Sequence, residues 1–243
     1  MVGGPAASDA VARARRLPRL RVGLHVVLVE GPPVLPPGEI PDLVGASGNL
    51  RTDIARLGFD IFVRPSVRRQ ARAEIEAQFE AYRATGLALD HVNAHKHFQL
   101  HPTIAEEIIA IGRGYGLRGL RVPIEPVSVL ANVEASAKPG LTYLTAPWAR
   151  RLRRRARRAG LQCPDAVFGL AWSGAMTTSR LLGLLRHLPD GRTEIYTHPA
   201  TAGDFRGHAP GYRYADELAA LTAPPAIAAA RRPDFALGGY ADF

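Results

Sequence analysis

Two patterns of apolar residues alternate along this chain. Short apolar, β-branched runs predict strands at residues 21–29, 87–92, 118–123 and 193–197, with a strand-to-loop passage at 168–174. Apolar positions spaced by three or four residues predict helices at 8–17, 64–85, 103–115, in pieces within 128–160, at 178–188 and at 216–223. Because strands and helices alternate, we expect an α/β fold, with a parallel sheet or barrel and its chemistry at the carboxyl ends of the strands.

The length and composition favour a single globular domain. A chain of 243 residues can bury a full core, and no apolar run reaches the roughly 18 residues of a membrane-spanning helix. The first twenty residues do not resemble a secretory signal, so we expect a cytoplasmic protein. Cys163 is the single cysteine, which excludes an internal disulfide and a thiolate metal cluster. The long loop at 31–50 is a candidate for substrate contact.

The net charge of +9 is concentrated in one segment. Seven arginines fall in the run from Arg150 to Arg158. A solvated helix face is the favoured interpretation, and contact with an anionic membrane surface is the alternative. Nucleic acid is not expected as a partner, because no aromatic residues that could stack on bases interleave with the arginines.

Four of the eight histidines lie within residues 91–101, where a predicted strand leads into a helix. The T-x-x-E pattern at 103–106 predicts a capping box at the start of that helix. If the triplet 95–97 is extended, His95 and His97 point to the same side. A helical triplet would align His91 with His95 instead, but Gly86 and the apolar run before the triplet argue against it.

The histidines suggest a metal site that draws on several strands. Hydrolytic sites commonly bind a divalent ion through two histidines and a carboxylate. A lone histidine in an apolar strand is more often a core residue, yet His25 and His95, one from each of two strands, are the ligands we choose. His97 would face the substrate or complete the ligand set. Asp90, Glu30, Glu125 and Glu194 are available carboxylates, and spacing places none of them.

Two further residues could assist hydrolysis of an amide or ester. His198, which follows a strand and precedes a proline, suits a general acid for the leaving amine. Arg121 could stabilise the developing oxyanion or pin a carboxylate. An ordinary ion pair between Arg121 and Glu125 is an equally good interpretation.

Five passages, at 22–31, 90–97, 120–126, 168–174 and 194–200, together resemble the YdjC-like (chitooligosaccharide deacetylase) family, most closely its hopanoid-biosynthesis-associated branch. The resemblance implies an irregular (β/α) barrel that removes an acetyl group from an N-acetylated sugar with a divalent metal, Mg or Zn. In that branch it also implies an N-acetylglucosaminyl hopanoid as substrate.

The resemblance assigns roles to particular residues. His25 and His95 match metal ligands, and His97, Arg121 and His198 match pocket positions. Four further residues of the matching passages are taken as substrate-binding candidates, namely Glu30, Asn93, Glu125 and Trp172.

The chain departs from the family pattern at its start. Family members begin with a strand ending in Asp-Asp-Phe-Gly, which supplies a metal carboxylate, whereas residues 1–7 resemble the end of the second strand. We therefore expect the barrel to lack its first strand. A start at an internal methionine of a longer reading frame is the favoured interpretation, and a genuine remnant is the alternative. We expect the 243-residue chain to bind metal poorly and to hydrolyse little.

Two other functions stay open, namely a different metal-dependent amide hydrolase and a non-catalytic binding protein at the membrane surface. The expected partners are an N-acetylated sugar or glycolipid, the membrane through residues 150–158, and a second copy in a homodimer.

Overall fold

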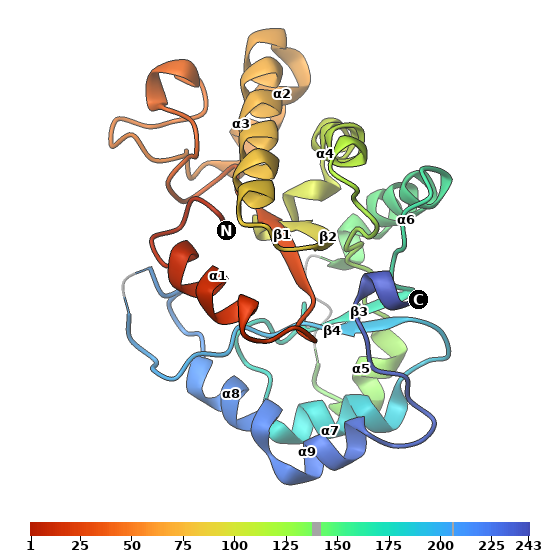
Figure 1. The fold of residues 1–243 in the computed structure, drawn as a ribbon. Helices are drawn as coiled ribbons and strands as arrows, with labels where there is room; N and C mark the ends of the chain where they lie inside the picture. Colours follow the sequence, from red (N-terminus) through yellow and green to blue (C-terminus); the bar gives the residue numbers. More distant parts are fainter. Residues whose placement is uncertain (138–141, 206) are drawn as a thin grey trace. The chain divides into compact units, whose positions relative to one another are not determined.

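The chain forms two compact units in a computed structural model that describes residues 1–137, 142–205 and 207–243 (Figure 1). Unit 1 comprises residues 1–122, 150–163 and 238–243, and unit 2 comprises residues 123–149 and 164–237. The chain thus crosses from one unit to the other more than once. The single catalytic domain expected from the sequence stays a prediction.

The sheet of unit 1 is built on one parallel strand pair. β1 (Val22–Val26) pairs with β2 (Leu89–Ala94), and the register aligns His25 with Asn93. Isolated parallel bridges continue the pairing from Val92 to Leu120 and from Gly119 to Gln162. The strand predicted at 118–123 is therefore present only as these bridges.

Helices cover this strand pair, as Figure 1 shows. Unit 1 contains α1 (Ala7–Arg15), the short helix η1 (Pro37–Glu39), α2 (Ile54–Val63), α3 (Pro65–Ala84), η2 (His95–Leu100), α4 (Pro102–Gly114) and, at the C-terminus, η3 (Tyr240–Asp242). Every apolar position that predicts α3 is buried, from Val67 to Tyr82. The sequence pattern assigned nothing to α2, which is only ten residues long.

The predicted capping box of α4 is wrong. The helix begins at Pro102, and the position before it is His101, with no side-chain cap. Proline is favoured at the first helical position because its fixed φ suits a helix and its missing N–H is not needed there. The helix therefore starts before Thr103, which is buried within its first turn.

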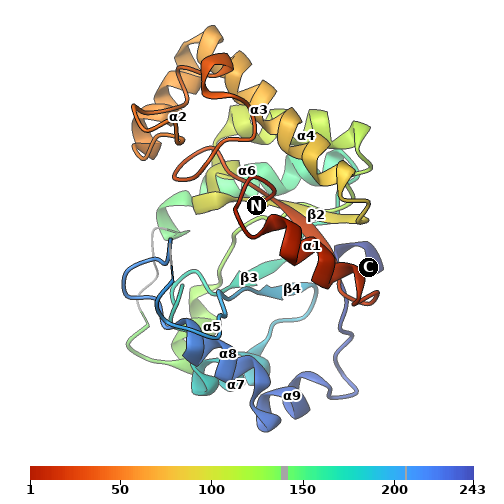
Figure 2. The same ribbon diagram turned by 60° about the vertical axis from the view of Figure 1, so that its left-hand side comes forward.

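Unit 2 has its own parallel strand pair and core. β3 (Ala166–Phe168) pairs with β4 (Thr193–Ile195). Four helices gather around a shared apolar cluster (Figure 2), namely α5 (Val127–Val133), α7 (Thr178–His187), α8 (Tyr214–Thr222) and α9 (Pro224–Ala230). α9 was not predicted from its proline-rich sequence, yet Pro224 lies in the first turn, where proline is tolerated.

A further helix, α6 (Thr142–Arg158), carries the arginine run.

The described strands form two separate two-stranded sheets, so the structure shows an α/β fold with few parallel strands, and a closed barrel stays a prediction. Within the described residues, no helix is both long and apolar enough to cross a membrane.

Two buried polar side chains of α3 hold the segment that follows β1. The Glu74 carboxylate accepts hydrogen bonds from the backbone N–H groups of Val34 (2.9 Å) and Leu35 (3.0 Å). The Gln78 amide accepts from Val27 N–H at 2.9 Å and donates to its carbonyl oxygen at 2.6 Å. Since both side chains are buried, these bonds are well shielded from water and fix the start of the loop.

We predict that Glu74→Ala lowers the free energy of unfolding by about 3 kcal/mol, because it removes the acceptor of two backbone donors. Chemical denaturation measures this change. Glu76→Ala, on the exposed face of the same helix, is the matched control and should change stability by less than about 0.5 kcal/mol. Equal effects of the two substitutions would contradict the role of Glu74.

Candidate active site

The histidine triplet after β2 is neither extended nor α-helical. η2 begins at His95, and Lys96 (φ 51°) and His97 (φ 55°) adopt left-handed backbone conformations. The expectation that His95 and His97 point to one side of a strand does not apply, because the strand ends at Ala94.

Backbone strain is concentrated at this turn. Among the described residues, Glu30 (φ 54°), Lys96 and His97 are the non-glycine residues with positive φ. The Lys96 ammonium forms an ion pair with the Glu30 carboxylate, which joins two of the strained residues. A left-handed non-glycine residue costs about 1–3 kcal/mol, and such strain tends to cluster at functional sites.

His25 and His95 lie together beside this turn. Because the β1–β2 register places His25 beside Asn93, the His25 Nδ1–H donates to Asn93 Oδ1. His25 Nε2 is then 3.5 Å from His95 Nδ1, with the rings at 74°. On its other side, His95 Nε2 is 3.8 Å from Glu30 Oε2. Each imidazole therefore has an oxygen near one nitrogen and turns its other nitrogen toward the partner histidine.

The local electrostatics keep His25 uncharged. Burial lowers the pKa of His25 to about 3, and the positive charge of Arg121 acts in the same direction, against the hydrogen bond to Asn93. His25 is therefore neutral at physiological pH, and neutral imidazole is the form that binds metal ions.

The two facing nitrogens suit two ligands of one divalent ion. Ligands about 2.1 Å from a tetrahedral ion lie about 3.4 Å from each other, close to the 3.5 Å between His25 Nε2 and His95 Nδ1. Among the residues that the structure describes, no set of three or more His, Cys, Asp or Glu side chains could hold a metal ion. The pair therefore offers two ligands of a metal site, and a third is not identified.

Arg121 and His97 also belong to unit 1. Arg121 follows the bridge at Leu120, its backbone N–H donates to Val92 O (3.0 Å), and its carbonyl oxygen accepts from the Gln99 side chain (3.3 Å). His97 is half-buried in η2.

His198 belongs to unit 2, where it follows β4. Its ring makes edge or tilted contacts with Tyr196 (5.5 Å between centroids) and Tyr212 (5.1 Å). Its backbone N–H donates to the buried Glu217 carboxylate, which also accepts from Met176 N–H. The position of this imidazole within unit 2 is thus well defined.

Comparisons with known proteins agree on one family. The family described as YdjC-like protein matches residues 1–232. The chain belongs to this family. A carbohydrate deacetylase of Geobacillus stearothermophilus is 27% identical over 247 residues, which cover 100% of this chain and 84% of that protein. The carbohydrate deacetylase of Homo sapiens is 31% identical over 231 residues, which cover 87% of this chain and 65% of that protein.

The fold has a counterpart among solved structures. The crystal structure of a proposed cellobiose-phosphate cleavage protein from Enterococcus faecalis V583 matches with a TM-score of 0.73 and 21% identity. The match covers 100% of this chain and 85% of the other. The α/β fold of this YdjC-like chain is therefore shared with a protein of low sequence identity.

Glu125 lies in unit 2 and holds the turn after β3. Its carboxylate accepts hydrogen bonds from the backbone N–H groups of Gly169 (2.9 Å), Leu170 (3.0 Å) and Ala171 (2.9 Å). Burial raises the pKa of Glu125 despite these three donors. The geometry favours an anchor for the turn, and the predicted contact with substrate stays a prediction.

Trp172, which follows this turn, is buried in the core of unit 2. The Arg180 guanidinium lies 5.3 Å from its ring centroid. The predicted contact of Trp172 with substrate likewise stays a prediction.

Lys96 lies in the centre of the histidine triplet and was not predicted from the sequence as a site residue. The available signal was a single lysine between two histidines, with Glu30 directly after the strand that carries His25. Asn93 was predicted as a substrate-binding residue, and the structure shows a contact that was not predicted, in which its side chain orients His25.

We predict that Glu125→Ala lowers the free energy of unfolding by about 3 kcal/mol or more, because three backbone donors lose their acceptor. Glu125→Gln keeps an acceptor oxygen and should cost less. Urea denaturation measures both variants, with the exposed Asp234→Ala as control. An Ala variant as stable as the parent would show that Glu125 does not anchor the turn.

Proposed function

We propose that this YdjC-like chain is a metal-dependent deacetylase that hydrolyses the N-acetyl group of an N-acetylglucosamine-type sugar. The paired nitrogens of His25 and His95 are the observation that carries the proposal. Its relatives from bacteria and mammals are named carbohydrate deacetylases. The proposed scaffold is an irregular (β/α) barrel, and the proposed location of the protein is the cytoplasm.

His25 Nε2 and His95 Nδ1 would hold the ion, with Mg or Zn as candidates. A bound divalent ion would lower the pKa of a water molecule and polarise the acetyl carbonyl. Asn93 keeps a proton on His25 Nδ1 and so leaves the lone pair of Nε2 available. Because the described residues offer two ligands, we expect weak metal binding and slow turnover by the 243-residue chain.

The remaining residues would act on the substrate. Arg121 carries a permanent positive charge that would stabilise the oxyanion formed when water attacks the amide carbon. His198 would give a proton to the leaving amine. His97 would contact the sugar, as would the substrate-binding candidates Glu30 and Asn93.

We predict that purified protein with added Zn²⁺ or Mg²⁺ releases acetate from N-acetylglucosamine oligosaccharides, and that His25→Ala or His95→Ala lowers the rate by at least about 100-fold. Acetate release and bound metal are measured together. His187→Ala, at the exposed end of α7, is the control. Unchanged acetate release and metal content in both site variants would contradict the proposal. Cleavage of small amides but not of N-acetylated sugars would favour another amide hydrolase.

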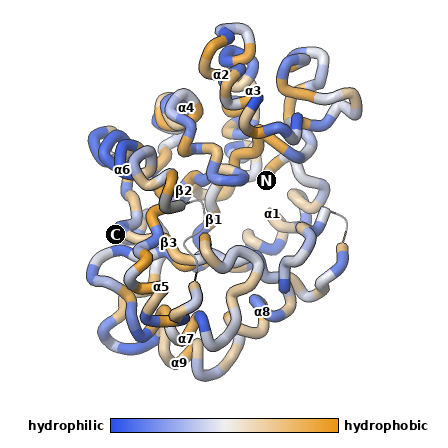
Figure 3. The backbone as a smooth tube through the Cα atoms, turned by 180° about the vertical axis from the view of Figure 1, so that it is seen from behind, coloured by the Kyte–Doolittle hydropathy of each residue, from blue (hydrophilic) through white to orange (hydrophobic). Residues whose placement is uncertain are grey.

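We further propose that the substrate is a glycolipid, such as an N-acetylglucosaminyl hopanoid, reached at an anionic membrane surface. Unit 1 has 23 Lys and Arg against 13 Asp and Glu, a net charge of +10, whereas unit 2 has 8 against 9. The tube of α6 is strongly hydrophilic along the arginine run (Figure 3). A homodimer stays a prediction.

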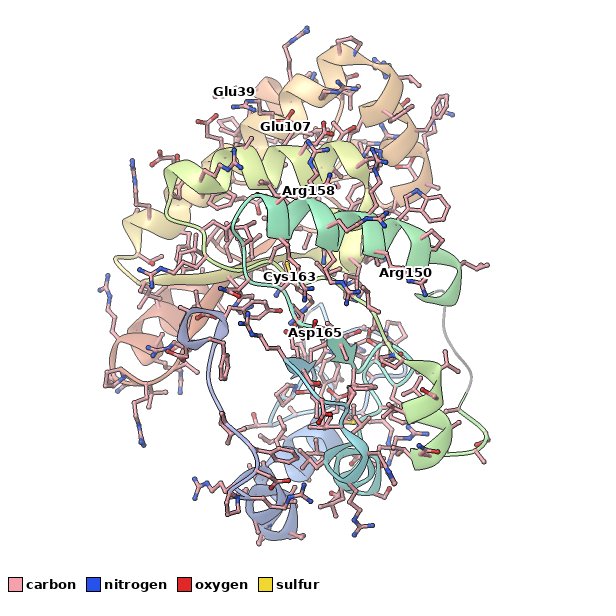
Figure 4. All side chains as sticks on the ribbon, turned by 90° about the vertical axis from the view of Figure 1, so that its right-hand side faces the viewer. Glu39, Glu107, Arg150, Arg158, Cys163 and Asp165 are labelled. Atoms are coloured by element: carbon pink, nitrogen blue, oxygen red, sulfur yellow. The ribbon has the colours of Figure 1, made fainter. Side chains whose placement is uncertain are left out.

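A hollow beside α6 could receive an anionic lipid headgroup. Figure 4 shows α6, with Arg150 and Arg158, next to α4, which carries Glu107. The hollow has a volume of about 270 Å³, and both helices contribute to its wall. Its lining includes Arg113, Arg155 and Arg158, and Arg155 forms an ion pair with Glu106.

We predict that the protein binds vesicles containing phosphatidylglycerol more tightly than neutral vesicles, since each basic residue near an anionic surface contributes about 1 kcal/mol. Arg154→Ala/Arg158→Ala should weaken binding about 30-fold in a sedimentation assay. Arg186→Ala/Arg231→Ala removes the same charge from unit 2 and should have a smaller effect. Equal binding to neutral and anionic vesicles would exclude this surface.

A further inference from the structure

A row of polar side chains in unit 1 leads from the C-terminal residues to His25. Asp90 Oδ2 is 2.8 Å from His91 Nδ1, and His91 Nε2 is 3.4 Å from Asn93 Nδ2. Asn93 Oδ1 in turn contacts His25 Nδ1. Asp90, His91 and Asn93 all lie on β2, next to the strand that carries His25.

The chemistry of each group fixes the direction of these hydrogen bonds. An ionised carboxylate only accepts, so His91 must donate its Nδ1–H to Asp90. With the Nδ1–H of His91 directed at Asp90, the lone pair on its Nε2 accepts from the Asn93 NH₂ group, which turns the Asn93 carbonyl oxygen toward His25. His25 therefore donates its Nδ1–H, and its Nε2 keeps a lone pair toward His95.

The C-terminal residues hold the far end of this row. The Asp90 carboxylate accepts hydrogen bonds from the backbone N–H groups of Tyr240 and Ala241, both at 3.0 Å. The Tyr240 ring stacks on His91 with 4.5 Å between centroids and 19° between planes. Burial by itself would raise the pKa of Asp90, but the hydrogen bonds from Ala241, His91 and Tyr240 lower it overall, so the carboxylate is ionised at neutral pH.

Two glycines make room for the stacked rings. A Cβ atom at Gly23 would come within 2.6 Å of the His91 ring, and one at Gly119 within 2.4 Å of the Tyr240 ring. Both glycines are therefore required by close packing on this side of the sheet.

We propose that Tyr240 and Ala241, acting through Asp90, His91 and Asn93, hold His25 in the tautomer that presents its Nε2 lone pair toward His95. Asp90 and His91 are then positioning residues for the metal-binding pair, although neither contacts the metal or the substrate. This inference rests on the proposed function only in taking His25 and His95 as metal ligands. A purely structural Asp90–His91 pair would anchor the C-terminus and leave the tautomer of His25 unaffected.

The test uses His91→Phe, which keeps an aromatic ring against Tyr240 but removes both ring nitrogens. We expect ¹⁵N NMR of the metal-free protein to show a smaller Nδ1–H population of His25. We expect Zn²⁺ affinity, measured by calorimetry, to fall by about 10- to 100-fold. Asp90→Asn is the second variant in case His91→Phe does not fold, and it should shift both readouts in the same direction.

Asp234→Asn is the control, because Asp234 is an exposed carboxylate of unit 2 that pairs with Arg232 and takes no part in holding the C-terminal segment. It should leave the tautomer and the Zn²⁺ affinity unchanged. An unchanged His25 tautomer in folded His91→Phe or Asp90→Asn protein would overturn the inference. If the deacetylase proposal fails for lack of acetate release, the NMR readout still tests this inference, because it requires neither metal nor substrate.

Discussion

The register of β1 against β2 is the constraint on which the candidate site depends. Alignment of His25 with Asn93 brings the imidazole to its hydrogen-bond acceptor and leaves the other ring nitrogen facing His95. A shift of one residue would move His25 to the opposite face of the sheet, because side chains alternate along a strand. The metal-binding potential of the protein thus depends on pairing between two strands that lie more than sixty residues apart in sequence.

Buried carboxylates hold several of the segments that follow strands, because they accept hydrogen bonds from backbone N–H groups of those segments. Glu74 holds the segment after β1, Glu125 holds the turn after β3, and Glu217 holds the backbone of His198 after β4. Asp90 does the same for the C-terminal residues. Such bonds are strong because the acceptor is charged and shielded from solvent. The segments that carry the candidate functional residues are therefore held by side chains from other elements.

Most helices and strands could be predicted from sequence because they depend on local periodicity, whereas α2 and α9 were not predicted. The apolar spacing at 64–85 predicts α3 almost to its ends. The left-handed conformations of Lys96 and His97 have no such signal, since an ion pair with the distant Glu30 supports them. The three amides bound by Glu125 were equally inaccessible, because the donors lie more than forty residues away. Chemical type and order along the chain identified His25 and His95, whereas long-range hydrogen bonds supplied the geometry.

The close approach of Gly23 to His91 couples two distant positions of the sequence. A methyl group at position 23 would come within 2.6 Å of the His91 imidazole and within 2.7 Å of the His91 carbonyl oxygen, and a smaller side chain at position 91 would relieve only the first of these contacts. A smaller residue at 91 would remove the acceptor for the Asn93 amide. Gly23 and His91 therefore form one steric unit, and substitution of the glycine would act on the chemistry of the neighbouring strand without introducing a polar group or a charge.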